Sequence, residues 1–112
     1  MQYLWHLMKE YCRYEILLPL QFNDGESVPE ELIADTQREI RKRFDAAPQD
    51  PEPVKCQWKH NGQVFREKLA RIWVAVEDTP ENRQFFVEFK ERLKERFQQL
   101  DIWLSKHPIE LL

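Results

Sequence analysis

The chain has 112 residues, of which 42% are hydrophobic and 33% are charged, which is typical of one globular domain with a single core and excludes a disordered or fibrous protein. Its formal net charge of -3 at pH 7 carries no basic excess, so the sequence predicts no nucleic-acid partner. No apolar run approaches the roughly 20 residues of a membrane span, so no membrane partner is predicted either.

The first twelve residues, MQYLWHLMKEYC, are predicted to form an extension or a short helix ahead of the domain, which we place at residues 13–112. They lack the basic lead-in and the small-residue cleavage site of a secretory signal. The two cysteines, Cys12 and Cys56, are too few for a disulfide framework, so both are expected to be free thiols in a cytoplasmic protein.

A first strand is predicted at residues 14–22, YEILLPLQF, because apolar residues recur there with the period of two that gives a strand one apolar face. Pro19 has no N–H to donate and is expected at a bulge or near the end of this strand. Ser27 and Glu30 then have the spacing of a capping box, which predicts a helix over residues 28–44. Its buried face is expected to hold Ile33, Thr36 or Gln37, Ile40 and Phe44.

A hairpin is predicted next, after a proline-rich connector at residues 45–53. Its two strands, at residues 54–60 and 63–77, meet at Asn61-Gly62. This pair is favoured in two-residue turns that need positive φ at both positions. It is the strongest turn signal in the chain.

A second helix is predicted to open at Asp78, Thr79 and Pro80, because Asp78 and Glu81 have capping-box spacing and proline suits the first turn. Its buried stripe is expected to contain Phe86, Phe89, Leu93, Phe97 and Leu100. A last strand is predicted at residues 102–111, at an edge of the sheet because Pro108 cannot donate to a ladder.

The elements therefore follow the order strand, helix, strand, strand, helix, strand. With right-handed crossovers, this order predicts an α+β, ferredoxin-like fold, in which a four-stranded antiparallel sheet carries both helices on one face. The opposite face of the sheet is expected to be open.

That open face is predicted to be aromatic. Pairing across Asn61-Gly62 puts Trp58 opposite Phe65, and the alternation of the third strand continues the same face to Trp73. The interface or pocket residues predicted there are Val54, Trp58, Phe65, Glu67, Leu69, Arg71, Trp73 and Trp103. An apolar patch of this size exceeds what monomers usually expose, so something is expected to cover it.

The sequence leaves three covers open. A second copy packed against the face gives a homodimer without a catalytic role, which is the principal prediction. A small molecule in a pocket roofed by the second subunit gives a binding protein or a cofactor-independent enzyme, with Glu67, Arg71, Cys56 and His60 as the polar groups that orient it. The third cover is the N-terminal segment folded back across the sheet.

The charged residues of this face have two interpretations. Glu67 and Arg71 flank Leu69 on one strand face, and a charged rim around an interface is favoured over a catalytic acid with an anion clamp. The sequence contains no glycine-rich phosphate loop, serine elbow or zinc-type CxxC pair, so no cofactor is predicted.

The histidines give no metal signal. Cys56 and His60 are four residues apart on a strand, which separates their Cα atoms by about 13 Å and argues against a zinc site. His6 and His107 have no partner in the sequence and are expected to be ordinary surface or edge residues.

Asp24, in the loop after the first strand, supports a third function. Small dimeric nucleases that accompany CRISPR systems share this order of elements and place a metal-binding aspartate at the end of their first strand, a position that Asp24 resembles. The resemblance implies a metal-dependent nuclease with Asp24 as a ligand, whereas Asp24-Gly25 is also an ordinary turn dipeptide. An RNA-recognition module shares the topology as well, but VFREKLARIWVAVE does not match its motif on the third strand.

Nearly the whole chain after Arg13, from YEILLPLQFNDG to DTPENRQFFVEFKERLKERFQQLDIWLSKHPIELL, carries a further resemblance. It is similar to a family of small bacterial, notably cyanobacterial, proteins of about this size that has no assigned activity. The motifs that carry the resemblance are a turn, a helix cap, a helix and a closing strand. It implies a stand-alone cytoplasmic domain and supplies no catalytic residues.

Overall fold

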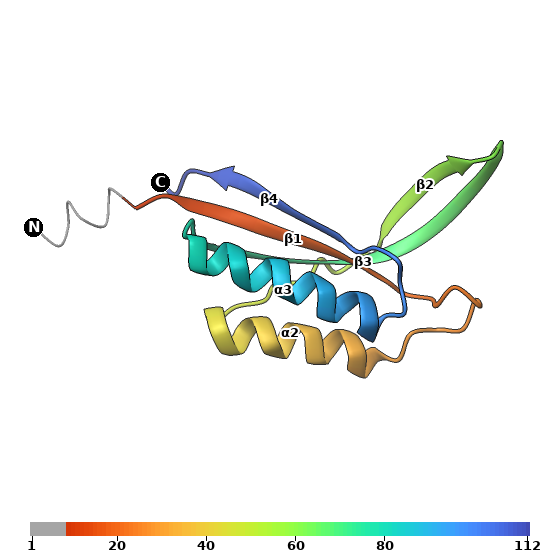
Figure 1. The fold of residues 1–112 in the computed structure, drawn as a ribbon, viewed down its shortest axis with the longest axis horizontal. Helices are drawn as coiled ribbons and strands as arrows, with labels where there is room; N and C mark the ends of the chain where they lie inside the picture. The colour runs from red at the N-terminus through yellow and green to blue at the C-terminus, as the bar shows by residue number, and fades with distance from the viewer. Residues whose placement is uncertain (1–8) are drawn as a thin grey trace, which may run out of the picture.

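The computed structural model describes residues 9–112, and its elements follow the predicted order. They are β1 (Tyr11–Pro19), α2 (Glu30–Phe44), β2 (Val54–His60), β3 (Gln63–Glu77), α3 (Pro80–Arg96) and β4 (Trp103–Ile109). The four strands form one antiparallel sheet in the order β2-β3-β1-β4, and both helices lie on one face of it (Figure 1). This is the predicted α+β ferredoxin-like fold.

The hydrophobic core lies between the helices and the sheet. Alternate residues of β1 and β3 point into it, because successive side chains of a strand point to opposite faces. The core residues of these two strands are Cys12, Tyr14, Ile16, Leu18, Ala70, Ile72, Val74 and Val76. From α3, the Phe86 ring stacks on Tyr14 at 3.9 Å and on Phe44 at 5.4 Å between ring centroids. One side chain therefore joins β1, α2 and α3.

The N-terminal boundary differs from the prediction. β1 begins at Tyr11, so Tyr11 and Cys12 belong to the sheet and not to an extension. The predicted short helix covered residues 1–12, of which residues 1–8 lie outside the described residues and residues 9–12 are not helical. The predicted folding back of the N-terminal segment also falls on residues 1–8. β1 ends at Pro19, which confirms that this proline lies at a strand end.

The predicted capping box of the first helix is wrong. α2 begins at Glu30, its N-cap residue is Pro29, and no side chain caps it. Ser27 instead forms an isolated β-bridge with Gln21, which places its backbone outside the first turn. Of the two alternatives for the buried face, Thr36 is the buried one, and its hydroxyl donates to the Leu32 carbonyl at 2.8 Å.

The second helix also begins differently. Thr79, not Asp78, is the N-cap residue of α3, and its hydroxyl accepts a hydrogen bond from the Asn82 N–H at 3.1 Å. The Asp78 carboxylate pairs with Lys106 of β4 at 2.7 Å. Pro80 is the first helical residue, as predicted.

The buried stripe of α3 is confirmed for Phe86, Phe89, Leu93 and Phe97. It is wrong for Leu100, which is 96% exposed. α3 ends at Arg96, and Gln98 takes a left-handed φ of 55°, so Leu100 leaves the helical spacing on which the prediction rested. β4 lies at an edge of the sheet, as predicted from its proline.

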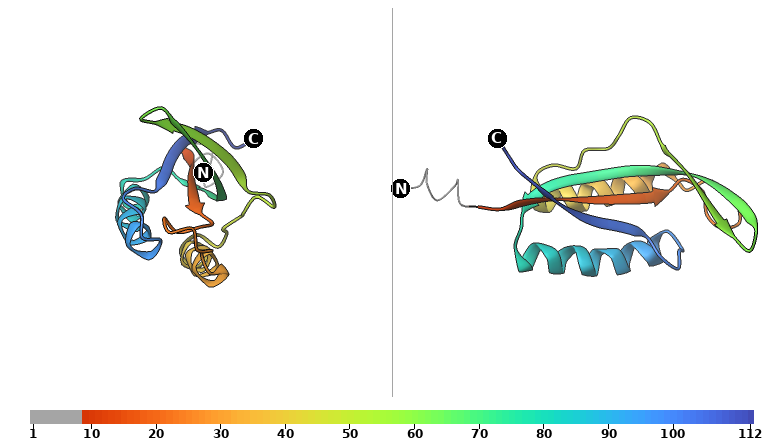
Figure 2. Two further views of the ribbon diagram at one scale, coloured as in Figure 1. Left: turned by 90° about the vertical axis from the view of Figure 1, so that its right-hand side faces the viewer. Right: turned by 90° about the horizontal axis from the view of Figure 1, so that it is seen from above.

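The strand β3 is longer than its neighbours, and its two halves have different partners. Residues 69–77 pair with β1, whereas residues 63–69 pair with β2. Because β1 ends at Pro19, the first half of β3 and all of β2 extend beyond the body of the sheet as a two-stranded ribbon, residues 54–69, which we call the arm. Figures 1 and 2 show the arm projecting at the end of the molecule away from the C terminus.

The tip of the arm is the predicted two-residue turn. Asn61 and Gly62 have φ values of 51° and 79°, the left-handed conformation that glycine and asparagine tolerate best. Both predicted strand ranges of this hairpin are confirmed.

Candidate functional site

One face of the arm is aromatic. The residues on this face, which we call the aromatic face, are Val54, Cys56, Trp58, His60, Gln63, Phe65, Glu67 and Leu69. Trp58 lies directly opposite Phe65, and the two rings stack with centroids 4.4 Å apart and planes 14° from parallel. Trp58 remains 43% exposed and Phe65 37% exposed. The pair is therefore a preformed stacking surface that the described part of the chain leaves partly uncovered.

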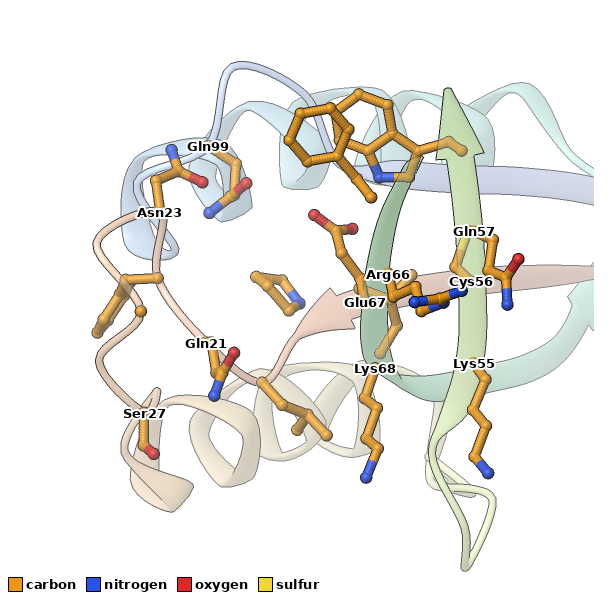
Figure 3. A pocket seen from close by; sticks show the side chains of 17 residues that line it. Gln21, Asn23, Ser27, Lys55, Cys56, Gln57, Arg66, Glu67, Lys68 and Gln99 are labelled. Atoms are coloured by element: carbon orange, nitrogen blue, oxygen red, sulfur yellow. The ribbon is translucent and has the colours of Figure 1, made fainter. Parts of the chain in front are cut away.

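Beside the arm lies a cleft of about 870 Å³, between the arm and the loop that follows β1 (Figure 3). The loop is folded tightly, because Phe22 N–H donates to the Glu26 carbonyl at 2.8 Å and Gly25 N–H donates to the Phe22 carbonyl at 2.9 Å. Gly25 permits this turn through a φ of 88°. The loop thus forms a fixed wall facing the arm.

The side chains around the cleft are of four kinds, one of which is the cations Lys55, Arg66 and Lys68 of the arm. The arm supplies the stacked aromatic pair and the Glu67 carboxylate, while the far wall supplies the amides of Gln21, Asn23 and Gln99. In Figure 3 the Glu67 side chain extends toward the loop, whereas Lys55 and Gln57 extend from the opposite side of β2. A carboxylate accepts hydrogen bonds, and an amide both donates and accepts them. This arrangement suits a small molecule that has a flat ring and hydroxyl groups.

The structure divides the predicted aromatic patch into two parts. The predicted residues Trp58, Phe65, Glu67 and Leu69 line the cleft, and Val54 pairs with Leu69 at the base of the arm. Arg71, Trp73 and Trp103 lie instead on the body of the sheet. Phe65 and Trp73 are eight residues apart on one strand, which puts their Cα atoms about 26 Å apart.

The open face of the body is more polar than the sequence predicts. Arg71 forms ion pairs with Glu15 of β1 and, at 3.0 Å, with Asp50 of the connector. Trp73 lies under the Arg13 guanidinium, whose central carbon is 4.4 Å from the ring centroid. Arg71 is therefore an ion-pair partner of Glu15 and Asp50, whereas Glu67 lines the cleft.

His107 lies in this network and not alone at an edge. Its Nε2 atom is 2.8 Å from the Ser105 hydroxyl and 3.4 Å from Glu15. In a catalytic triad the serine and the carboxylate bind different ring nitrogens, so that the imidazole can accept the serine proton while the carboxylate orients it. Here both contact the same nitrogen, and a hydrolytic triad is not formed.

Sequence reasoning missed three members of this network. Glu15 lies on β1 and Ser105 lies on β4. The register of the two strands places them directly opposite each other. Correct pairing of β4 would have found them. Asp50 comes from the connector, whose Asp50 N–H donates to the Arg71 carbonyl at 3.0 Å, and no periodic pattern signals such a contact.

Asp24 stabilises the turn in the loop after β1. Its carboxylate accepts a hydrogen bond from the Glu26 N–H at 2.9 Å. Within residues 9–112, no group of three histidine, cysteine, aspartate or glutamate residues lies close enough to hold a metal ion.

The two thiols differ in environment, and both are free, as predicted. Cys12 is buried, and burial, together with the carboxylate of Asp78, raises the pKa of its thiol. A raised pKa keeps the thiol protonated and unreactive near neutral pH, because the thiolate is the nucleophile. Cys56 is partly exposed and lines the cleft.

We therefore expect the folded protein to react with an aromatic disulfide reagent at pH 8 through one thiol per chain, and through two thiols in denaturant. Cys56→Ser should remove the fast thiol, whereas Cys12→Ser should leave it. The reaction is followed by absorbance. Two fast thiols in the folded wild type would contradict the burial of Cys12.

No helix in residues 9–112 is long and apolar enough to cross a bilayer. No protein-family model and no curated protein matches the chain.

Similarity is found among solved structures. The chain resembles a phage SAM lyase in complex with S-methyl-5'-thioadenosine, with a TM-score of 0.65 and 18% identity over 91% of this chain and 84% of that chain. It resembles the divalent cation tolerance protein CutA1 from Thermus thermophilus, with a TM-score of 0.63 and 15% identity over 91% and 86% of the two chains. It also resembles CutA from Synechococcus elongatus, with a TM-score of 0.60 and 6% identity over 91% and 79%.

These identities establish the fold and no closer relationship. The resemblance to a family of small bacterial proteins remains a prediction from the sequence. The chain is thus a small protein of the ferredoxin-like fold.

Proposed function

We propose that the protein is a small-molecule-binding homo-oligomer, the dimer being its smallest form, in which a second copy covers the aromatic face of the arm and the cleft holds a nucleoside-like ligand. The observation that carries this proposal is the stacked, exposed pair of Trp58 and Phe65 on the wall of the cleft. The two free thiols also favour a reducing compartment, so we place the protein in the cytoplasm.

The arm supports the second copy. An isolated two-stranded ribbon is marginally stable in water, and an exposed strand edge is a template for pairing with another chain. Beyond Pro19, no strand among residues 9–112 pairs with the other edge of residues 63–68 of β3. A second copy is the partner always present at equal concentration, and closed homo-oligomers are the commonest assemblies. Its contact would both pair the edge and roof the cleft in which the aromatic rings are available to a ligand.

The cleft supports the ligand class. Aromatic rings provide a stacking surface for a base, worth about 1–3 kcal/mol per base where this has been measured. A carboxylate such as Glu67 can accept hydrogen bonds from ribose hydroxyls, and the facing amides can bind the edge of a base. The phage SAM lyase of the same fold was solved with S-methyl-5'-thioadenosine, and this compound is the first probe to use.

The test is calorimetric titration of the wild-type protein with S-methyl-5'-thioadenosine and with adenosine. We expect Glu67→Gln to weaken binding about 10- to 100-fold, because hydrogen bonds to a charged group contribute roughly 1.5–3 kcal/mol. Glu88→Gln, an exposed change of the same kind on α3, is the matched control and should leave the affinity unchanged. Binding should also slow the labelling of Cys56.

Two results would overturn the ligand assignment. One is the absence of heat and of thiol protection with both probes up to millimolar concentration. The other is binding that Glu67→Gln and Glu88→Gln affect equally. Either result would leave the proposed homo-oligomer untouched, because that proposal is tested separately by the mass of the protein in solution.

A further inference from the structure

The second face of the arm is strongly basic. Residues that alternate with the aromatic face point the other way, and we call them the basic face: Lys55, Gln57, Lys59, Val64, Arg66 and Lys68. All six are exposed. Four of them are cations, no carboxylate stands among them, and none of these cations forms an ion pair within the described chain.

This clustering costs stability within the chain. Lys55 lies directly opposite Lys68 in the strand pair, and like charges placed opposite each other destabilise a ribbon. The arm has four cations and one carboxylate, hence a net charge of +3, so the remainder of a chain of net charge -3 carries -6. The net charge of the whole chain therefore hides a positively charged arm and a negatively charged remainder.

We propose that the basic face binds double-stranded DNA through its phosphates, without base specificity. On an antiparallel strand, residues on one face recur about every 6.8 Å, which is twice the roughly 3.4 Å that separates successive charges of one DNA strand along the helix axis. A two-stranded ribbon also has the width that the major groove, about 12 Å wide, admits. The four cations thus lie on an element that can follow a duplex.

Two other anionic partners fit less well. A membrane surface favours basic residues beside aromatic side chains that insert into the interface, but Trp58 and Phe65 point to the opposite face of the arm. A second copy of the chain has acidic groups, but its proposed contact is the aromatic face and not the cations of the basic face. DNA is therefore the partner that the arrangement favours.

The experiment measures binding of the full chain to a fluorescently labelled 20-base-pair duplex as a function of salt. Four phosphate contacts predict a slope of about -3.6 in log affinity against log salt, which is an affinity loss of about 150-fold between 50 and 200 mM salt. The double variant Lys55→Ala/Lys68→Ala should lower the slope to about -1.8. Arg41→Ala/Lys42→Ala, two exposed cations of α2, is the matched control and should bind as the wild type does.

Circular dichroism and light scattering establish first that each variant has the fold and mass of the wild type. A change of mass in the arm variant would assign the basic face to contact between copies and overturn the proposal. Equal losses in the two double variants would overturn it as well, as would tighter binding to vesicles with anionic lipid or to single-stranded RNA than to the duplex.

Discussion

Trp58→Glu is expected to separate the oligomer into folded monomers. The change places a carboxylate on the face that we propose a second copy covers, and an unpaired charge is costly to bury. Tryptophan residues at the centre of interfaces commonly contribute about 2 kcal/mol or more, so the dissociation constant should rise about 30-fold at least. Sedimentation velocity over a concentration series measures this change.

Gln57→Glu is the matched control. It is the neighbouring residue of β2, it introduces the same charge, and its side chain belongs to the basic face. We expect it to leave the mass of the protein unchanged. If both variants dissociate alike, the effect comes from charge on the arm and not from the aromatic face, and the proposed contact is wrong.

Phe86→Ala is expected to lower the free energy of unfolding by about 3–5 kcal/mol, as other truncations of buried phenylalanine do. Phe86 is 1% exposed, and its ring contacts Tyr14 and Phe44, so the deletion opens a cavity where three elements meet. Urea unfolding at a fixed protein concentration measures the change, because oligomerisation makes stability depend on concentration.

The neighbouring Val87 provides the comparison for this core truncation. Val87 lies on α3 and is 46% exposed, and surface substitutions usually change stability by within about 0.5 kcal/mol. We therefore expect Val87→Ala to unfold close to the wild type. Similar losses in Phe86→Ala and Val87→Ala would show that the described core is incorrect.

The periodic elements of the fold were predictable because their signals are local. The turn at Asn61-Gly62 determines the hairpin register, and the bounds of β2 and β3 followed from it. The helix starts were less predictable, because several residues competed for each cap. The N-cap residues are Pro29 and Thr79, whereas capping-box spacing favoured Ser27 and Asp78. Tertiary contacts determine where each helix begins.

The division of the aromatic patch between the arm and the body of the sheet could not be predicted from local patterns. No local pattern indicates that β1 stops at Pro19, so Trp73 and Trp58 were placed in one patch although only Trp58 is on the arm. The contact of Asp50 with Arg71 comes from a connector without periodicity. These are tertiary facts that local patterns do not encode.

Net charge says little about where charge lies on a folded chain. The prediction of no nucleic-acid partner used the net charge of the whole chain, which averages over elements that the fold separates. The same alternation that reveals the aromatic face places Lys55, Lys59, Arg66 and Lys68 on the other face of the hairpin. Charge counted by strand face, and not by chain, is the signal that identifies a basic ribbon in such a sequence.

Hydrogen exchange of the arm at two protein concentrations tests the central claim most directly, that a second copy covers the arm. The measurement compares peptides from residues 54–69 with peptides from β1 in the wild-type protein. We predict that the arm is protected when the mass is a multiple of 13.7 kDa and loses protection on dilution to the monomer, while β1 changes little. Exchange of the arm that is equally fast at both concentrations, with a mass of one chain throughout, would contradict the account.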